Sequence, residues 1–140
     1  MGYKHACETT VPVSKTKDSI EKLLIKYKAT ALQIGYDDER NVANIDFKMK
    51  GYAMRILFPL PLKTTNKTKN EQRLRTRWRD ALLSIKAKLV MVDTGFATFE
   101  KEFMPYLLMP DGRTVGDVML DEIKRGAILL LEAPEVTDKR

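Results

Sequence analysis

A single helical pattern, from residue 70 to residue 92, constrains the fold of this chain more than any other feature of its sequence. The segment reads NEQRLRTRWRDALLSIKAKLVMV and holds the only tryptophan and the densest run of arginines. At about 100° per residue, its large apolar side chains fall on one broad stripe, which must be buried against another layer of structure. The stripe consists of Leu74, Trp78, Ala81, Leu82, Ile85, Leu89 and Val92.

The rest of this helix divides into two polar stripes with a second, narrower apolar strip between them. One polar stripe consists of Arg73, Arg77, Asp80, Ser84 and Lys88. The other consists of Arg75, Arg79 and Lys86. The apolar strip between them consists of Leu83, Ala87 and Val90. We expect this strip to be covered by the chain's own domain or by a second copy in a homo-oligomer.

Before the helix come three strand-like segments, at residues 30–36, 41–50 and 52–58. In each, large apolar residues alternate with smaller or polar ones, which is the period of a half-buried strand. Residues 37–40 and the pair Lys50-Gly51 supply turns, while Pro59 and Pro61 remove backbone donors and end the last strand. We predict a three-stranded antiparallel meander with one apolar face that the long helix and a neighbour cover.

Shorter elements flank this central unit. Residues 1–13 are predicted to be an extended arm, and Ser14 is predicted to cap a helix over residues 15–28. The apolar face of that helix holds Ile20, Leu23, Leu24 and Tyr27. The polar segment 63–70, KTTNKTKN, is predicted to be a mobile surface loop that joins the sheet to the long helix.

The C-terminal third is predicted to contain two short helices and one strand. Thr98 begins the first helix, and Thr114 begins the second in a pattern similar to a capping box, with Gly126 as its end. Between them, residues 106–109 read as a strand and residues 110–112 as a turn. The apolar run 127–131 is expected to dock on the core. Together these elements predict a single α+β domain over residues 14–131, with a loose tail at 132–140.

Length and composition limit where such a chain acts. With 140 residues it has room for one domain, and with one cysteine it cannot form an internal disulfide, which suits a reducing compartment. The N-terminus lacks the apolar core of a signal peptide, and the longest apolar run, 127–131, is too short to span a bilayer. We therefore expect a cytoplasmic protein that has no membrane partner.

The positive charge of the chain is concentrated in one segment. Residues 63–88 hold nine basic and two acidic residues, a net charge of +7, whereas the other residues hold 16 basic and 17 acidic ones. This segregation indicates an anionic partner more strongly than the overall net charge of +6 does. The candidate nucleic-acid-binding residues are Lys63, Lys67, Lys69, Arg73, Arg75, Arg77, Arg79 and Lys88.

Other chemistries find little support in the sequence. There is no glycine-rich phosphate loop, and the single histidine, His5, lies near the N-terminus with Cys7, too few ligands for a metal. Pro110-Asp111 with Glu122-Ile123-Lys124 matches a nuclease pattern, but that pattern requires its Glu and Lys on a strand, and here a helix is predicted. Trp78 is interpreted as a core residue and not as a base-stacking one, because it lies on the apolar stripe. No cofactor, metal or catalytic residue is predicted.

Several segments together resemble a family of small hypothetical bacteriophage proteins. They are VPVSKTKDSIEKLLIKYKA, the meander ending in FPLP, RTRWRDALLSIKAKL and LLMPDGRTVG, and they cover most of residues 10–120. The resemblance implies a phage or prophage origin and an intracellular role. It brings no activity and no catalytic residues.

The sequence leaves two main hypotheses for function. The first is a non-enzymatic accessory protein that binds nucleic acid through its phosphates, independently of sequence, with the basic loop and helix. The second is a protein-binding module that inhibits or redirects a host factor, in which the arginines meet an acidic partner surface. An enzyme would rest on the nuclease pattern alone.

Overall fold

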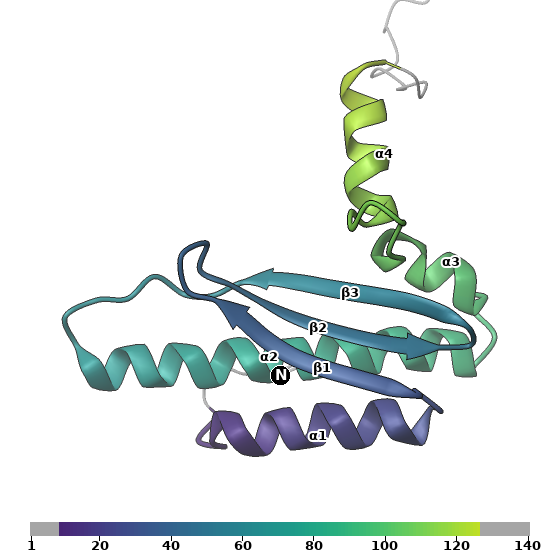
Figure 1. The fold of residues 1–140 in the computed structure, drawn as a ribbon. Helices are drawn as coiled ribbons and strands as arrows, with labels where there is room; N and C mark the ends of the chain where they lie inside the picture. Colours follow the sequence, from purple (N-terminus) through teal and green to yellow (C-terminus); the bar gives the residue numbers. More distant parts are fainter. Residues whose placement is uncertain (1–8, 127–140) are drawn as a thin grey trace, which may run out of the picture.

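The structure is a computed structural model that describes residues 9–126 of the chain. Its elements follow the order helix, three strands, long helix and short C-terminal helices, so the predicted α+β class is confirmed (Figure 1). The bounds are α1 Val13–Lys26, β1 Ala31–Asp37, β2 Val42–Met49, β3 Tyr52–Pro59, α2 Lys67–Asp93, α3 Phe99–Phe103, η2 Met104–Tyr106 and α4 Val115–Lys124.

The three strands form an antiparallel sheet in the order β1-β2-β3, as the alternating pattern predicted. In the register, Ile34 lies opposite Ile45, and Ile45 lies opposite Ile56. Lys50 and Gly51 join β2 to β3, both with positive φ, 54° and 85°. Two successive positive φ values are the backbone of a type I′ turn, whose twist matches that of the paired strands.

Both long helices lie on one face of this sheet, side by side (Figure 1). The apolar stripe of α2 faces the sheet: Trp78, Leu82, Ile85 and Leu89 are buried, and the other predicted members pack against them. From α1, Ile20 and Leu24 complete the core together with the inward row of the sheet. The inward row consists of Ala43, Ile45, Phe47, Met49 and Met54. The prediction for the central helix is therefore confirmed.

Two predictions at helix starts were wrong. Helix α1 begins at Val13 with Pro12 as its N-cap residue, so Ser14 lies inside the first turn and caps nothing. A proline suits this boundary, because its ring holds φ near −65° and the first turn needs no donor from it. The segment 63–70 is not a loop throughout, because α2 already begins at Lys67, where the side chain of Asn66 accepts a hydrogen bond from the Lys69 amide (3.0 Å).

The C-terminal caps were predicted correctly, and the strand between them was not. Thr98 and Thr114 cap α3 and α4, each accepting a backbone hydrogen bond from the residue three positions later. Residues 106–109 form only two isolated bridges, in which Leu107 pairs with Met54 and Leu108 with Thr114. The bridge to Met54 at the β3 edge is too short to add a fourth strand. The apolar run 127–131 lies outside the described residues.

Helix α4 stands away from the sheet and the long helices (Figure 1). It contacts the η2 turn, where Gly116 approaches so closely that a Cβ there would lie 2.9 Å from the Pro105 carbonyl oxygen. None of its residues is buried, and Met119 and Leu120 are exposed. The compact core of the described chain therefore ends with α3 and η2, and α4 is an appendage whose start is held by the close approach at Gly116 and by the hydrogen bond from the Val115 amide to the Leu107 carbonyl oxygen (2.8 Å).

Candidate nucleic-acid interface

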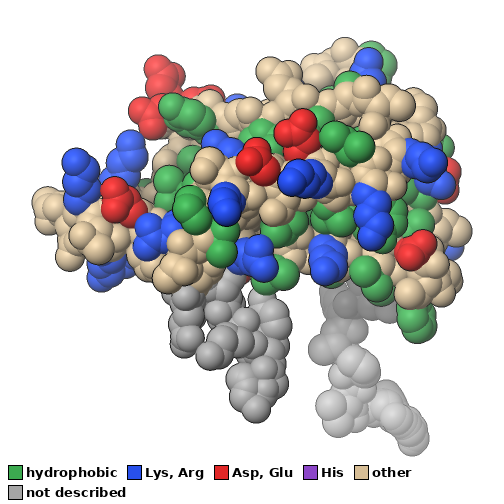
Figure 2. Space-filling model, turned by 90° about the horizontal axis from the view of Figure 1, so that it is seen from below, with side chains coloured by type: hydrophobic (Ala, Val, Ile, Leu, Met, Phe, Trp, Pro, Cys, Tyr) green, Lys and Arg blue, Asp and Glu red, His purple; other side chains and the backbone are tan. Residues whose placement is uncertain are grey.

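The first turns of α2 project beyond the ends of the strands and carry the most exposed cations of the predicted site (Figure 1). Lys63, Lys67, Lys69 and Arg73 are all exposed. Lys63 pairs with the carboxylate of Asp38 at 3.6 Å, but both side chains are about three-quarters exposed, so this ion pair contributes little. Figure 2, which looks onto the side formed by the helices, shows lysine and arginine side chains gathered at the left end, where α2 begins.

Side-chain amides hold the segment before α2 in place. Asn70 accepts from the Thr64 amide (2.8 Å) and donates to the Thr64 carbonyl oxygen (2.7 Å). Asn41, in the turn between β1 and β2, donates to the Leu60 carbonyl oxygen (3.0 Å). These bonds fix Lys63 beside the start of the helix. The expectation of mobility came from the polar composition, which does not reveal that the same polar residues bond to each other.

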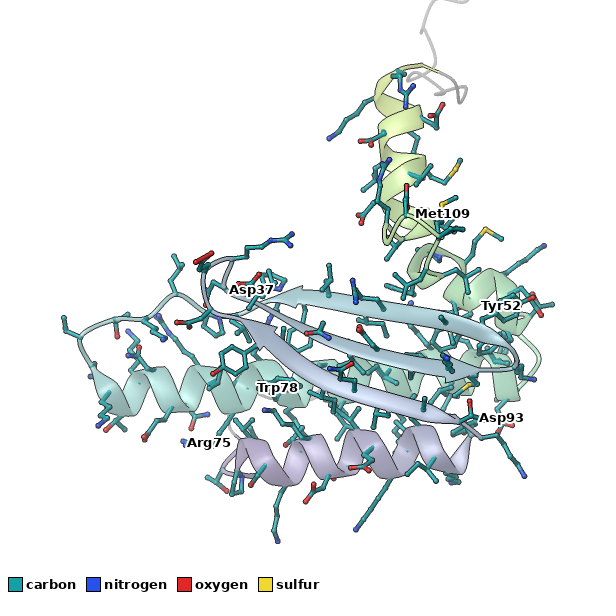
Figure 3. All side chains as sticks on the ribbon, viewed as in Figure 1. Asp37, Tyr52, Arg75, Trp78, Asp93 and Met109 are labelled. Carbon is teal, nitrogen blue, oxygen red and sulfur yellow. The ribbon has the colours of Figure 1, made fainter. Side chains whose placement is uncertain are left out.

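The three following arginines are only partly exposed, and Arg75 and Arg77 donate hydrogen bonds to groups of the described chain. Arg77 donates to the Pro59 carbonyl oxygen (2.7 Å), and its guanidinium lies 5.9 Å from the centre of the Phe58 ring. Arg75 donates to the side-chain oxygen of Gln72 (2.6 Å) on another side of the helix; Figure 3 labels its side chain near the start of α1. Arg79 is half-buried. Arg77 therefore joins α2 to the end of β3, whereas the bond of Arg75 to Gln72 lies within α2.

Lys88 lies 15 residues after Arg73 along α2, so it does not join the exposed cations at the start of the helix. Its ammonium group pairs with the Glu102 carboxylate of α3 (3.2 Å) and lies 4.9 Å from the centre of the Tyr106 ring. Burial lowers the pKa of Lys88, but the hydrogen bonds and charges of Tyr106 and Glu102 outweigh burial, so its pKa stands above the ordinary value. Lys88 therefore joins α2 to α3. A helical wheel of α2 alone does not predict this role.

Trp78 is a core residue, as its place on the apolar stripe indicated. It is 3% exposed, and Phe58 meets its ring edge-to-face at 5.0 Å. The Lys17 ammonium group of α1 lies 4.8 Å from the ring centre. The sequence carries no local signal for this contact, because Lys17 and Trp78 are 61 positions apart and meet only when the two helices pack.

The residues of the nuclease pattern do not form the strand geometry that such a site needs. Asp111 lies in an exposed turn, where it accepts a hydrogen bond from the Arg113 amide (2.9 Å). Glu122 and Lys124 lie on helix α4, as predicted, and Glu122 pairs with Arg125 (2.9 Å). Within residues 9–126, no group of three or more acidic, histidine or cysteine side chains is placed to hold a metal ion. His5 and Cys7 lie outside the described residues.

Comparisons with protein-family models, curated proteins and solved structures give no match to this chain. Among the described residues, no helix combines the length and apolar character needed to cross a membrane. The exposed cations Lys63, Lys67, Lys69 and Arg73 at the start of α2 are called the basic cluster below.

Proposed function

We propose that this chain is a non-enzymatic accessory protein of phage origin that binds nucleic acid through its phosphates. The observation that carries the proposal is the basic cluster, exposed on a helix end that projects past the sheet. Four cations on one projecting end neutralise several phosphates of a strand that passes across it, and the release of counterions favours binding. The N-terminus of a long helix adds a partial positive charge at the same place.

This binding is independent of sequence in the proposal. Sequence-specific recognition requires side chains that reach base edges from an element seated in a groove. The cations of the cluster are carried by long, flexible side chains that act on phosphates as point charges. The half-buried Arg75, Arg77 and Arg79 lie at the border of the cluster and extend the positive surface along α2.

The test is the salt dependence of binding to a labelled DNA duplex. If about four phosphates are neutralised, the logarithm of the binding constant falls with the logarithm of salt concentration with a slope of about −3.6 on duplex DNA. Fluorescence anisotropy at several salt concentrations measures this slope. A flat dependence, or no binding at micromolar protein in low salt, contradicts the proposal.

A second function, as a module that binds and inhibits or redirects a host protein, is favoured by apolar surface on α2. In the strip that the sequence indicated, Leu83 is half-buried, Ala87 is exposed and Val90 is 43% exposed, with Met91 exposed beside it. The described residues of the chain leave this strip open. Capture of a host protein from lysate that survives nuclease treatment supports this function, whereas loss of all captured material after nuclease treatment supports nucleic-acid binding.

A further inference from the structure

A pocket with a volume of about 380 Å³ opens beside the basic cluster. It lies where the start of α1, the end of β1, the segment after β3 and the first turns of α2 meet. Its apolar lining includes Leu60, Leu74 and the otherwise buried Trp78. This volume is near the lower end of the range for small-molecule sites, roughly 300–1,000 Å³, which suits one planar group.

Tyr36 lines the same pocket and is its most accessible aromatic residue. It follows Leu32 and Ile34 in the inward row of β1, but it is 66% exposed, whereas those two residues pack against the core. Its cross-strand partner is Ala43, which leaves little side chain beside the ring. A large aromatic ring left exposed next to an apolar hollow offers a flat surface on which another ring can stack.

The charged residues of the pocket include both signs. Lys17, Lys63, Asp38 and Glu71 are among its lining residues, and Lys63 and Asp38 pair with each other at 3.6 Å. A bare anion would be repelled by the two carboxylates. A nucleotide satisfies both kinds of group, because its phosphate attracts the lysines and the amino and imino groups of its base donate to the carboxylates.

We propose that this pocket receives one unpaired base of a single-stranded nucleic acid whose phosphates lie on the basic cluster. The base stacks on Tyr36 and covers the apolar lining beside Trp78, while Lys63 belongs to both the pocket and the cluster. The proposal rests on the phosphate binding proposed above and adds a substrate class to it. A paired base in a duplex is held in its stack, so the protein binds single strands in preference to duplexes at equal numbers of phosphates.

The experiment compares an oligothymidylate with an abasic deoxyribose-phosphate oligomer of the same length. The two carry the same phosphates, and only the first carries bases. We expect the oligothymidylate to bind at least about tenfold more tightly at matched salt, a difference of about 1.4 kcal/mol. We also expect it to change the fluorescence of Trp78, the only tryptophan of the chain, whereas the abasic oligomer leaves the fluorescence nearly unchanged.

Two variants test whether the base binds in this pocket. Tyr36→Ala is expected to bring the affinity for oligothymidylate close to that for the abasic oligomer, with little effect on abasic binding. Because Tyr36 is largely exposed, its truncation leaves the core intact. Phe96→Ala is the matched control, since Phe96 is also an exposed aromatic residue but lies between α2 and α3, at the other end of the long helix. This variant should bind both oligomers as the unaltered chain does.

The possible results separate this inference from the proposed function. Equal, salt-dependent binding of the two oligomers overturns the base pocket and leaves phosphate binding intact. No binding of either oligomer overturns both. A preference for bases that survives Tyr36→Ala, with unchanged Trp78 fluorescence, places the bases elsewhere and overturns the pocket assignment.

Discussion

Replacement of Lys67, Lys69 and Arg73 by glutamine is expected to remove most of the affinity for nucleic acid. Each lost phosphate contact makes the log–log salt slope less steep by about 0.9 on duplex DNA and about 0.7 on single strands. The loss of three contacts therefore reduces the slope by about 2.7 on duplex DNA and by about 2.1 on single strands. Extrapolated from 1 M salt to 0.1 M salt, these differences correspond to losses of about 500-fold and 100-fold in affinity.

The fold should tolerate these three substitutions. All three side chains are exposed, and glutamine has nearly the helix propensity of lysine and arginine. The cap made by the Asn66 side chain is kept. Removal of positive charge from the first turns of a helix also removes an unfavourable interaction with the helix dipole. A weaker complex then reports on binding and not on unfolding, which circular dichroism spectra of both proteins check.

The matched control removes the same charge from other surfaces. Lys48 on β2, Lys101 on α3 and Lys124 on α4 are all exposed and lie away from the start of α2. Their replacement by glutamine lowers the net charge from +6 to +3, as the first set does. We expect the control to keep most of the affinity and nearly the full salt slope. If both triple variants weaken binding equally, the net charge of the chain and not the basic cluster is responsible.

Phe103→Ala should cost the largest amount of stability of any single substitution discussed, about 3–5 kcal/mol. Phe103 is fully buried, although it lies on a helix of only five residues. Its ring meets Phe47 of the sheet edge-to-face at 6.2 Å and stacks on Phe99 at 4.9 Å. Truncation leaves a cavity between the sheet and α3, and it removes one of the contacts that hold the C-terminal segment to the core.

Urea unfolding followed by circular dichroism measures this loss, which is a large fraction of the roughly 5–15 kcal/mol that stabilises a typical domain. Phe96→Ala is again the matched control, because Phe96 is 80% exposed and its truncation should change the free energy of unfolding by less than about 0.5 kcal/mol. A loss below about 1 kcal/mol for Phe103→Ala would show that α3 does not pack on the sheet in solution.

The limits of the sequence are clearest at the candidate site. Eight cations were predicted as one binding surface from their density in the sequence. In the structure, Lys63, Lys67, Lys69 and Arg73 are exposed together, whereas Arg77 bonds to Pro59 and Lys88 to Glu102. A helical wheel gives the direction in which a side chain points, but it does not give the groups that the side chain contacts. Tyr36 alternates with Leu32 and Ile34, which favours the inward face of the sheet, and nothing local indicates that its side chain is 66% exposed.

Most helices and strands of this protein were predicted from local signals in the sequence. The period of the apolar residues in α2, the alternation in the strands, the turn at Lys50-Gly51 and the caps at Thr98 and Thr114 each depend on residues close in the chain. Tertiary packing, in contrast, sets which charges are neutralised, which aromatic rings are covered and where a pocket lies. Those properties depend on contacts between residues such as Lys17 and Trp78, or Lys88 and Glu102, which the packing of whole elements brings together.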